Sequence, residues 1–202
     1  MHKKVSITVP VYNQEELIVR ALDSVPRRDD IEVIVCDDGS TDETWSVLER
    51  YVADHPDLDI KLLRNETNMG ETYVRNRLLE NCTGKYVIGL DADDELITDR
   101  WEEALCHVMD EDIVYIDGIA KNGWYVGTNE VSKWNLGAVW LRFVKRSFIG
   151  DTKFPDTGFG TDREWSRALD RKPHIEKFTH ICAYKYNFPR EGSICWNANH
   201  QK

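Results

Sequence analysis

The chain has 202 residues, of which 41% are hydrophobic and 31% are charged, and its formal net charge is −10. This length suits one domain, and this composition supports a buried core, which excludes disordered and collagen-like classes. The acidic balance disfavours nucleic acid as a partner, because a negative surface repels phosphodiester backbones.

The cysteines and the apolar stretches indicate where the protein works. The five cysteines are odd in number and contain no Cys-x-x-Cys pair, which argues against a disulfide framework and favours a reducing compartment. No apolar run reaches the length of a signal peptide or a membrane span. We therefore expect a cytoplasmic protein without a transmembrane segment.

The first half of the chain alternates between strand and helix patterns. In chain order, hydrophobic periodicity predicts a strand at 5–11, a helix at 17–25, a strand at 31–36, a helix at 45–52, a strand at 60–63, a helix at 69–79 and a strand at 86–90. Ser40 or Thr41 is the expected cap of the second helix. Such alternation predicts an α/β fold with a mainly parallel central sheet flanked by helices.

The second half is less regular. We expect a strand at 113–116, a hairpin and loop at 119–135, a strand at 139–149, a helix at 162–170 capped by Thr161 or Asp162, and an extended run at 175–186. No linker or internal repeat separates the parts. The prediction is one domain, 1–202, with functional halves at 1–118 and 119–202.

Polar side chains follow three of the four early strands. Asn13, Asp38 and the pair Asp91 and Asp93 stand at the carboxyl ends, where open α/β sheets bind their ligands. Asp91 and Asp93 point to the same side of an extended chain, so their carboxylates repel each other. A bound Mg²⁺ or Mn²⁺ removes that conflict, particularly when a diphosphate completes its oxygen shell.

Simpler interpretations of the same residues stay open. Asp91–Asp94 could be a solvated turn in which Asp94 or Thr98 caps the next helix. A calcium loop is disfavoured because Leu96 stands where that turn needs glycine. A dinucleotide-binding or NTPase fold is disfavoured because no glycine-rich phosphate loop follows the first strand.

Four segments of the first half stand in a recognisable order: Val9-Pro10-Val11-Tyr12-Asn13, Val35-Cys36-Asp37-Asp38-Gly39-Ser40-Thr41-Asp42, Asn68-Met69-Gly70 with Arg75-Asn76, and Leu90-Asp91-Ala92-Asp93-Asp94. Their order and spacing resemble the signature of family-2 glycosyltransferases of the GT-A fold. The second half resembles that family more loosely, through Phe143-Val144-Lys145-Arg146-Ser147-Phe148 and Gly160-Thr161-Asp162-Arg163-Glu164-Trp165.

The resemblance implies a role for each donor-site residue. It assigns the nucleotide to a loop that carries Pro10, Tyr12 and Asn13, and base recognition to the Asp38 carboxylate. A group of four residues is expected to contact the nucleotide or diphosphate: Gly70, Arg75, Asp91 and Arg190. For Arg75 the alternative partner is Asp91. The metal would be bound directly by Asp93, with Asp91 beside it.

The resemblance also implies a catalytic base, Asp162. The family usually has Glu-Asp at this point, whereas this chain has Thr161-Asp162, and Glu164 is a second candidate. The implied reaction is inverting, Mn²⁺- or Mg²⁺-dependent transfer from a nucleotide-diphosphate sugar, most often UDP-linked in this family. The acceptor would be a glycan or another hydroxyl-bearing molecule.

Three further expectations accompany this reading. The aromatic and basic segment 134–148 is expected to pack under the acceptor site, and peripheral membrane contact there is the alternative. A sugar-nucleotide nucleotidyltransferase is a second candidate function, although its glycine-rich loop after the first strand is missing. A non-catalytic nucleotide-sugar-binding domain is the third.

Overall fold

The computed structural model describes residues 4–127, 138–158 and 160–187. Their helices and strands follow one another as β1 (Val5–Val11), α1 (Ile18–Asp23), β2 (Ile31–Asp37), α2 (Thr44–Asp54), β3 (Ile60–Arg64), α3 (Glu71–Asn81), β4 (Tyr86–Gly89), β5 (Glu95–Leu96), α4 (Thr98–Cys106), β6 (Ile113–Ala120), β7 (Tyr125–Val126), the 3₁₀ helix η2 (Val139–Leu141), β8 (Arg142–Lys145), α5 (Arg146–Ile149), α6 (Thr161–Asp170) and β9 (Glu176–Tyr186).

The described strands form one nine-stranded sheet in the order β3-β2-β1-β4-β8-β6-β9-β5, with β7 paired to β6. β1 runs parallel to β2 and β4, and β2 runs parallel to β3. β8 lies antiparallel between β4 and β6 and separates this parallel part from the parallel pair β6 and β9. The predicted α/β fold with a mainly parallel sheet is therefore confirmed.

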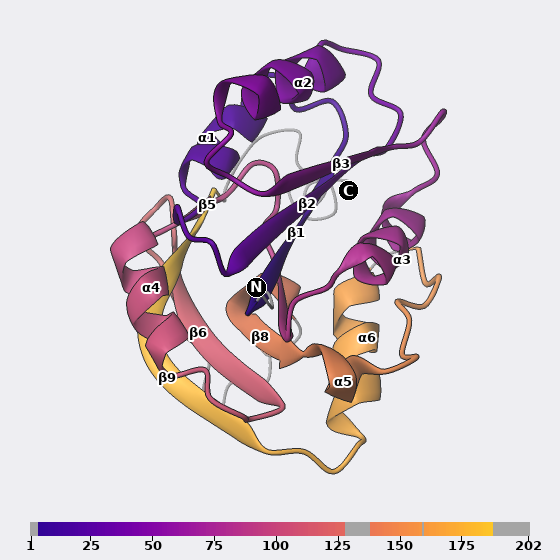
Figure 1. Cartoon of the computed structure of the whole chain (residues 1–202). Helices are drawn as coiled ribbons and strands as arrows, with labels where there is room; N and C mark the ends of the chain where they lie inside the picture. The colour runs from indigo at the N-terminus through magenta and orange to yellow at the C-terminus, as the bar shows by residue number, and fades with distance from the viewer. Residues whose placement is uncertain (1–3, 128–137, 159, 188–202) are drawn as a thin grey trace.

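Helices cover both faces of the sheet (Figure 1). α1, α2 and α4 contribute to one hydrophobic core, and α3, α5 and α6 contribute to the other. β1 shows how the sequence produces this arrangement, because its odd-numbered residues are all buried in the first core. Thr8 faces the other side, where its hydroxyl donates to the Ile88 carbonyl at 3.3 Å.

The expected strand at 139–149 is wrong in extent. Only Arg142–Lys145 is extended, with a 3₁₀ turn before it and the short helix α5 after it. The chain turns there because the Arg146 backbone N–H donates to the Lys85 carbonyl at 2.8 Å and its Nε donates to the Gly84 carbonyl at 2.9 Å. These contacts hold the first residue of α5 against the start of β4, and the alternating pattern does not reveal them.

Both expected helix caps are also wrong. The cap residue of α2 is Glu43 because the helix begins only at Thr44, and the Ser40 hydroxyl donates to the Asp37 carboxylate instead. The cap residue of α6 is Gly160, whose φ of +77° is accessible to glycine at little cost. Neither helix has a side-chain cap hydrogen bond.

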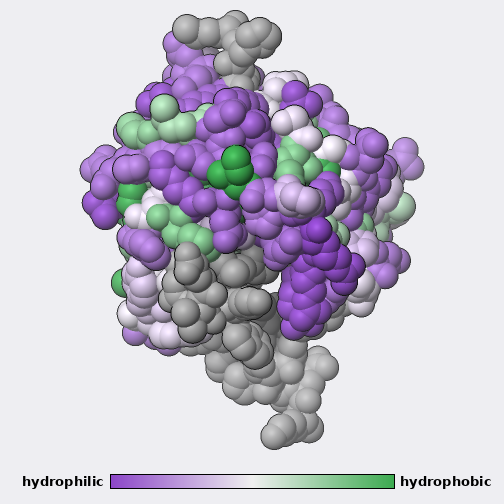
Figure 2. Space-filling model, turned by 90° about the horizontal axis from the view of Figure 1, so that it is seen from below, coloured by the Kyte–Doolittle hydropathy of each residue, from purple (hydrophilic) through white to green (hydrophobic). Residues whose placement is uncertain are grey.

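A helix that could cross a bilayer is not found within the described part of the chain. Figure 2 shows one face of the molecule, on which hydrophilic residues dominate and hydrophobic residues occur in small separate groups. Cytoplasmic location and peripheral membrane contact stay predictions.

Candidate active site

The predicted site residues follow parallel strands, so they meet at one edge of the sheet. Asn13 follows β1, Asp38 follows β2, and the turn Asp91–Asp94 follows β4. Because β1 pairs in parallel with both β2 and β4, the three carboxyl ends lie side by side. This edge is where a doubly wound sheet binds ligands.

The loops after β1 and β2 are joined by hydrogen bonds around Asn13. Its backbone N–H donates to the Ser40 hydroxyl at 2.9 Å, and its side-chain oxygen accepts from the Thr41 N–H at 2.9 Å. Asn13 has a φ of +50°, a conformation that Asn tolerates better than most residues. Pro10 lies in β1 and is partly buried. Tyr12, next to Asn13, is 42% exposed.

The Asp38 carboxylate closes the loop that leads into α3. It is 4% exposed and accepts from the Asn65 side-chain amide at 2.7 Å, the Met69 N–H at 2.8 Å and the Gly70 N–H at 2.9 Å. The predicted contact with a nucleotide base would therefore add to a carboxylate that already has three donors. Base recognition by Asp38 stays a prediction.

Two glycines near this loop have different reasons to be glycine. A Cβ on Gly39 would lie 2.6 Å from the Thr67 carbonyl carbon. A side chain at position 39 would therefore clash with the backbone of Thr67. A Cβ on Gly70 would meet nothing within 4 Å, and only its φ of +88° favours glycine. Gly70 therefore borders open space at the start of α3, where a ligand can approach the backbone.

Arg75 of α3 joins three carboxylates from separate parts of the chain. Its Nη2 lies 3.3 Å from Asp91 Oδ1, and its Nε lies 3.0 Å from Asp162 Oδ1 and 2.9 Å from Glu71 Oε1. Burial opposes its charge, but the carboxylates of Asp162, Asp91 and Glu71 outweigh this and raise the pKa of Arg75. The predicted metal site and the predicted base thus lie within reach of one guanidinium.

The turn after β4 concentrates negative charge. Burial, together with the charges of Asp162 and Asp93, raises the pKa of Asp91 to about 7, although Arg75 opposes the shift. Burial and the charges of Asp91 and Asp93 raise the pKa of Asp94 to about 8. Neighbouring carboxylates add to the effect of burial at Asp91 and Asp94 because a single arginine does not neutralise the negative charge of this turn.

Asp162 lies in the first turn of α6, whose dipole favours a carboxylate at this end. Burial raises the pKa of Asp162, while Arg75 opposes this. The Arg75 Nε–H is directed at Glu71, so Asp162 Oδ1 has an ion-pair contact without a hydrogen bond. This oxygen is buried against Arg75, whereas the Asp162 side chain as a whole is 24% exposed.

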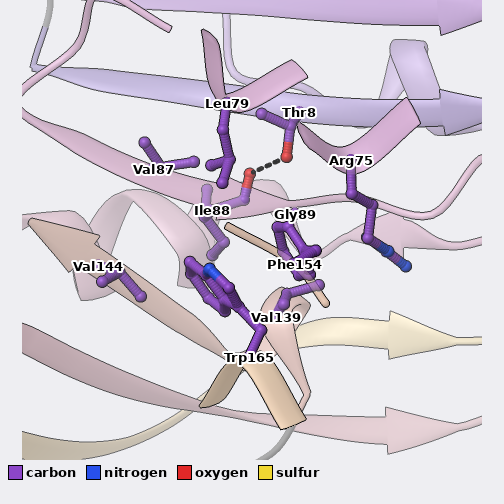
Figure 3. Close-up of a pocket in the computed structure, with 10 residues that line it drawn as sticks. All are labelled: Thr8, Arg75, Leu79, Val87, Ile88, Gly89, Val139, Val144, Phe154 and Trp165. Atoms are coloured by element: carbon purple, nitrogen blue, oxygen red, sulfur yellow. Dashed lines mark hydrogen bonds between the residues drawn. The ribbon is translucent and has the colours of Figure 1, made fainter. Parts of the chain in front are cut away.

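Aromatic packing holds Arg75 in place from below (Figure 3). The Arg75 guanidinium lies 5.9 Å from the centroid of Phe154, which stacks on Trp165 at 4.5 Å. Asn76 anchors Phe154, because its amide exchanges hydrogen bonds with the Phe154 backbone at 2.8 and 3.0 Å. The cavity between these residues and β4 measures about 20 Å³, which is room for one water molecule and too small for a nucleotide sugar.

The sequence did not single out every residue that shapes this site. Glu71 is four residues before Arg75, a helical spacing that could have indicated the ion pair. Tyr184 and Phe154 are distant in sequence from the residues they contact, and no local pattern reveals such pairs. The predicted diphosphate contact Arg190 lies outside the described residues.

Comparison with known proteins agrees with this geometry. The model of glycosyl transferase family 2 matches residues 6–172, most of the chain. The chain therefore belongs to glycosyltransferase family 2, and its fold is of the GT-A type.

Individual relatives extend the comparison. A Campylobacter jejuni GalNAc(5)-diNAcBac-PP-undecaprenol beta-1,3-glucosyltransferase is 32% identical over 97% of this chain and 68% of its own length. The putative colanic acid biosynthesis glycosyl transferase WcaA of Escherichia coli is 37% identical over 51% of this chain. The structure of Staphylococcus aureus TarS with UDP-GlcNAc has a TM-score of 0.78 and 26% identity over 94% of this chain.

The lengths differ. The matched region makes up 37% of WcaA and 60% of the TarS chain, so this chain corresponds to only part of each.

Proposed function

We propose that the chain is an inverting, metal-dependent glycosyltransferase that moves a sugar from a nucleotide-diphosphate sugar to an acceptor hydroxyl. One observation carries the proposal: Arg75 lies 3.3 Å from Asp91 and 3.0 Å from Asp162, which joins the predicted metal carboxylate to the predicted base. In this proposal residues 1–118 bind the donor and residues 119–202 bind the acceptor.

A UDP-linked donor is favoured by likeness to TarS, which was crystallised with UDP-GlcNAc. The nucleotide would lie along the ends of β1 and β2, where the exposed Tyr12 ring offers a face for stacking on a base. The diphosphate would approach the open side of Gly70, at the N-terminus of the eleven-residue helix α3.

The residues present fit a divalent cation of the Mg²⁺ or Mn²⁺ kind. Asp91 and Asp93 supply oxygen ligands. Burial and the neighbouring negative charges raise the pKa of Asp91 to about 7, and a bound cation would offset those charges. In the part of the chain that the structure describes, no three His, Cys, Asp or Glu side chains make a complete metal site, so further ligands would come from diphosphate and water. The cation would neutralise charge on the departing nucleoside diphosphate.

Asp162 would act as general base on the acceptor. Its carboxylate, on a side chain that is 24% exposed, takes the proton as the acceptor oxygen attacks C1 of the donor sugar from the face opposite the leaving group. The C1–O bond to the diphosphate breaks as the new glycosidic bond forms, which inverts the anomeric centre. Arg75 keeps the Asp162 side chain in place through their 3.0 Å ion pair.

Transfer and binding measured together test this proposal. A panel of nucleotide sugars is titrated with Mn²⁺ present, and turnover of the tightest binder is compared between the wild type and Asp162→Asn. We expect turnover to fall about 100-fold or more while donor affinity is retained.

Other outcomes would favour the alternative functions. Unchanged turnover removes Asp162 from the role of base. Pyrophosphate release from a nucleoside triphosphate would instead indicate a nucleotidyltransferase. Donor binding without any transfer or hydrolysis would indicate a binding domain.

A further inference from the structure

The turn Asp91–Asp94 is held at three successive points, none of which uses the carboxylates of Asp91 and Asp93. The Asp91 N–H donates to the Tyr184 hydroxyl at 3.1 Å. The Asp93 carbonyl accepts from Arg20 Nη2 at 2.7 Å. The Asp94 carboxylate accepts from the Tyr184 hydroxyl at 2.8 Å and from the Asn187 N–H at 2.7 Å.

Tyr184 connects this turn to strand β9. It belongs to β9, is fully buried, and its ring stacks on Trp140 with the centroids 4.5 Å apart. Its hydroxyl accepts one hydrogen bond from Asp91 and donates one to Asp94, so both of its bonding directions are used within the turn. A side chain from the second half therefore fixes the backbone that carries the predicted metal ligands.

Arg20 holds the same turn from α1. Its guanidinium also lies 3.1 Å from Glu95, which in turn lies 3.1 Å from Lys185 of β9. The turn is thus fastened between α1 and β9, while the Asp91 carboxylate is directed at Arg75.

We propose that Tyr184 is a positioning residue for the metal site, and that Arg20 assists it. Resting on the proposed function, the inference is that these contacts preset the separation of the Asp91 and Asp93 carboxylates before the cation arrives. Ligands held in advance lose less freedom on binding, so the affinity for the cation is higher. Without the hydroxyl, the Asp91 N–H lacks its acceptor and the Asp94 carboxylate lacks a donor, and the turn relaxes.

The test compares two buried tyrosines. Tyr184→Phe removes the hydroxyl at the turn, and Tyr86→Phe removes the hydroxyl that donates to the Glu111 carbonyl at 2.9 Å. Tyr86 is also fully buried but does not touch the turn. Both variants lose one buried hydrogen bond, so both are expected to be less stable, but only one should change the metal site.

The readout is the dissociation constant of Mn²⁺ in the presence of UDP, measured from the electron paramagnetic resonance signal of unbound Mn²⁺. We expect Tyr184→Phe to raise this dissociation constant about tenfold, which corresponds to a lost contact worth about 1.4 kcal/mol. Tyr86→Phe should change the dissociation constant less than about twofold. An unchanged constant in Tyr184→Phe overturns the inference, as does an equal rise in both variants.

A second pair of variants keeps the test decisive if Tyr184→Phe does not fold. Arg20→Gln removes the contact with the Asp93 carbonyl, and Arg27→Gln removes a partly exposed arginine next to α1 that pairs with Asp23 and Asp57. Weaker Mn²⁺ binding in Arg20→Gln alone supports the inference, and equal binding in both overturns it. Failure of the wild type to bind Mn²⁺ at all overturns the proposed metal dependence instead.

Discussion

Two acidic segments at the same edge of the sheet are used in different ways. After β2, the Asp38 carboxylate accepts three hydrogen bonds, and Asp37 accepts from the Ser40 N–H at 3.1 Å and pairs with Arg64 at 3.3 Å. After β4, the Asp91 carboxylate pairs with Arg75 while its backbone N–H is held by Tyr184. The first segment uses both of its carboxylates to build the loop, whereas the second is held through its backbone and the Asp94 carboxylate, and the Asp91 carboxylate faces Arg75.

Because of this difference, the segment after β2 stabilises the loop, and the segment after β4 keeps carboxylates for a ligand. Burial of Asp38 after β2 is tolerated because both of its carboxylate oxygens accept hydrogen bonds from the chain itself. After β4, burial and neighbouring carboxylates raise the pKa of Asp91 and of Asp94, a state that a ligand with positive charge relieves. Substitutions in the two segments should therefore affect different measurements.

The largest expected effect belongs to the segment after β4. Asp93→Ala should reduce metal-dependent turnover about 1,000-fold, because charge stabilisation by a bound cation is worth several kcal/mol. The free energy of unfolding of the Asp93→Ala variant should stay within about 0.5 kcal/mol of the wild-type value. Initial rates across a Mn²⁺ titration and urea denaturation measure the two quantities, and a large loss of stability with intact turnover would reverse the comparison.

The segment after β2 should respond in the opposite way. Asp38→Ala leaves the Asn65 amide and the N–H groups of Met69 and Gly70 without their acceptor. We expect the free energy of unfolding to fall by about 3 kcal/mol, since each unsatisfied buried donor is costly. Urea denaturation followed by fluorescence checks this value, and a stability equal to that of Asp93→Ala would remove the distinction between the segments.

Glu71 offers a sharper test inside the site. Glu71→Ala frees the Arg75 Nε–H to turn to Asp162, which would then be a weaker base. We expect kcat to fall about fivefold with little change in the KM of the donor. Glu80→Ala is the matched control, because Glu80 lies on the same helix and pairs with Lys153 away from the site; an equal loss in both variants would contradict this role.

The smallest effect is expected at the opposite edge of the sheet. Burial alone would raise the pKa of Glu32, but hydrogen bonds from Ser6, Thr83 and Gly84 outweigh it and lower that pKa below 4.5. A lowered folded-state pKa stabilises the protein above the unfolded value, and this contribution is lost as the pH falls through the folded value. Glu32→Gln should therefore cost about 1 kcal/mol at pH 7, after allowance for solvent screening.

Denaturation of the wild type and Glu32→Gln from pH 7 down to pH 3 measures this contribution. The difference between the two proteins should shrink as the pH falls below about 4. A difference that stays constant with pH would show that Glu32 contributes through packing rather than through its charge.

Hydrophobic patterning predicted the strands and helices from β1 to β4, because the helices have apolar stripes and β1, β2 and β4 are almost completely buried apolar runs. It did not predict β5 or α4. It did not predict that 139–149 divides into three elements, since the contacts of Arg146 with Gly84 and Lys85 join distant residues. The resemblance located Asp91 and Asp162 separately, and the sequence named Asp91 as one possible partner of Arg75, but only the structure shows that Arg75 also pairs with Asp162. Nor can a sequence show whether a carboxylate such as that of Asp38 already has its donors.

The proposed function depends on a cation that is bound by Asp91 and Asp93 and also contacts the diphosphate of the donor. Calorimetric titration of UDP into the wild type and Asp93→Ala, each with and without Mn²⁺, measures this dependence. We expect Mn²⁺ to tighten UDP binding at least about tenfold in the wild type and to have little effect in the variant. Equal UDP affinity in all four titrations would contradict it.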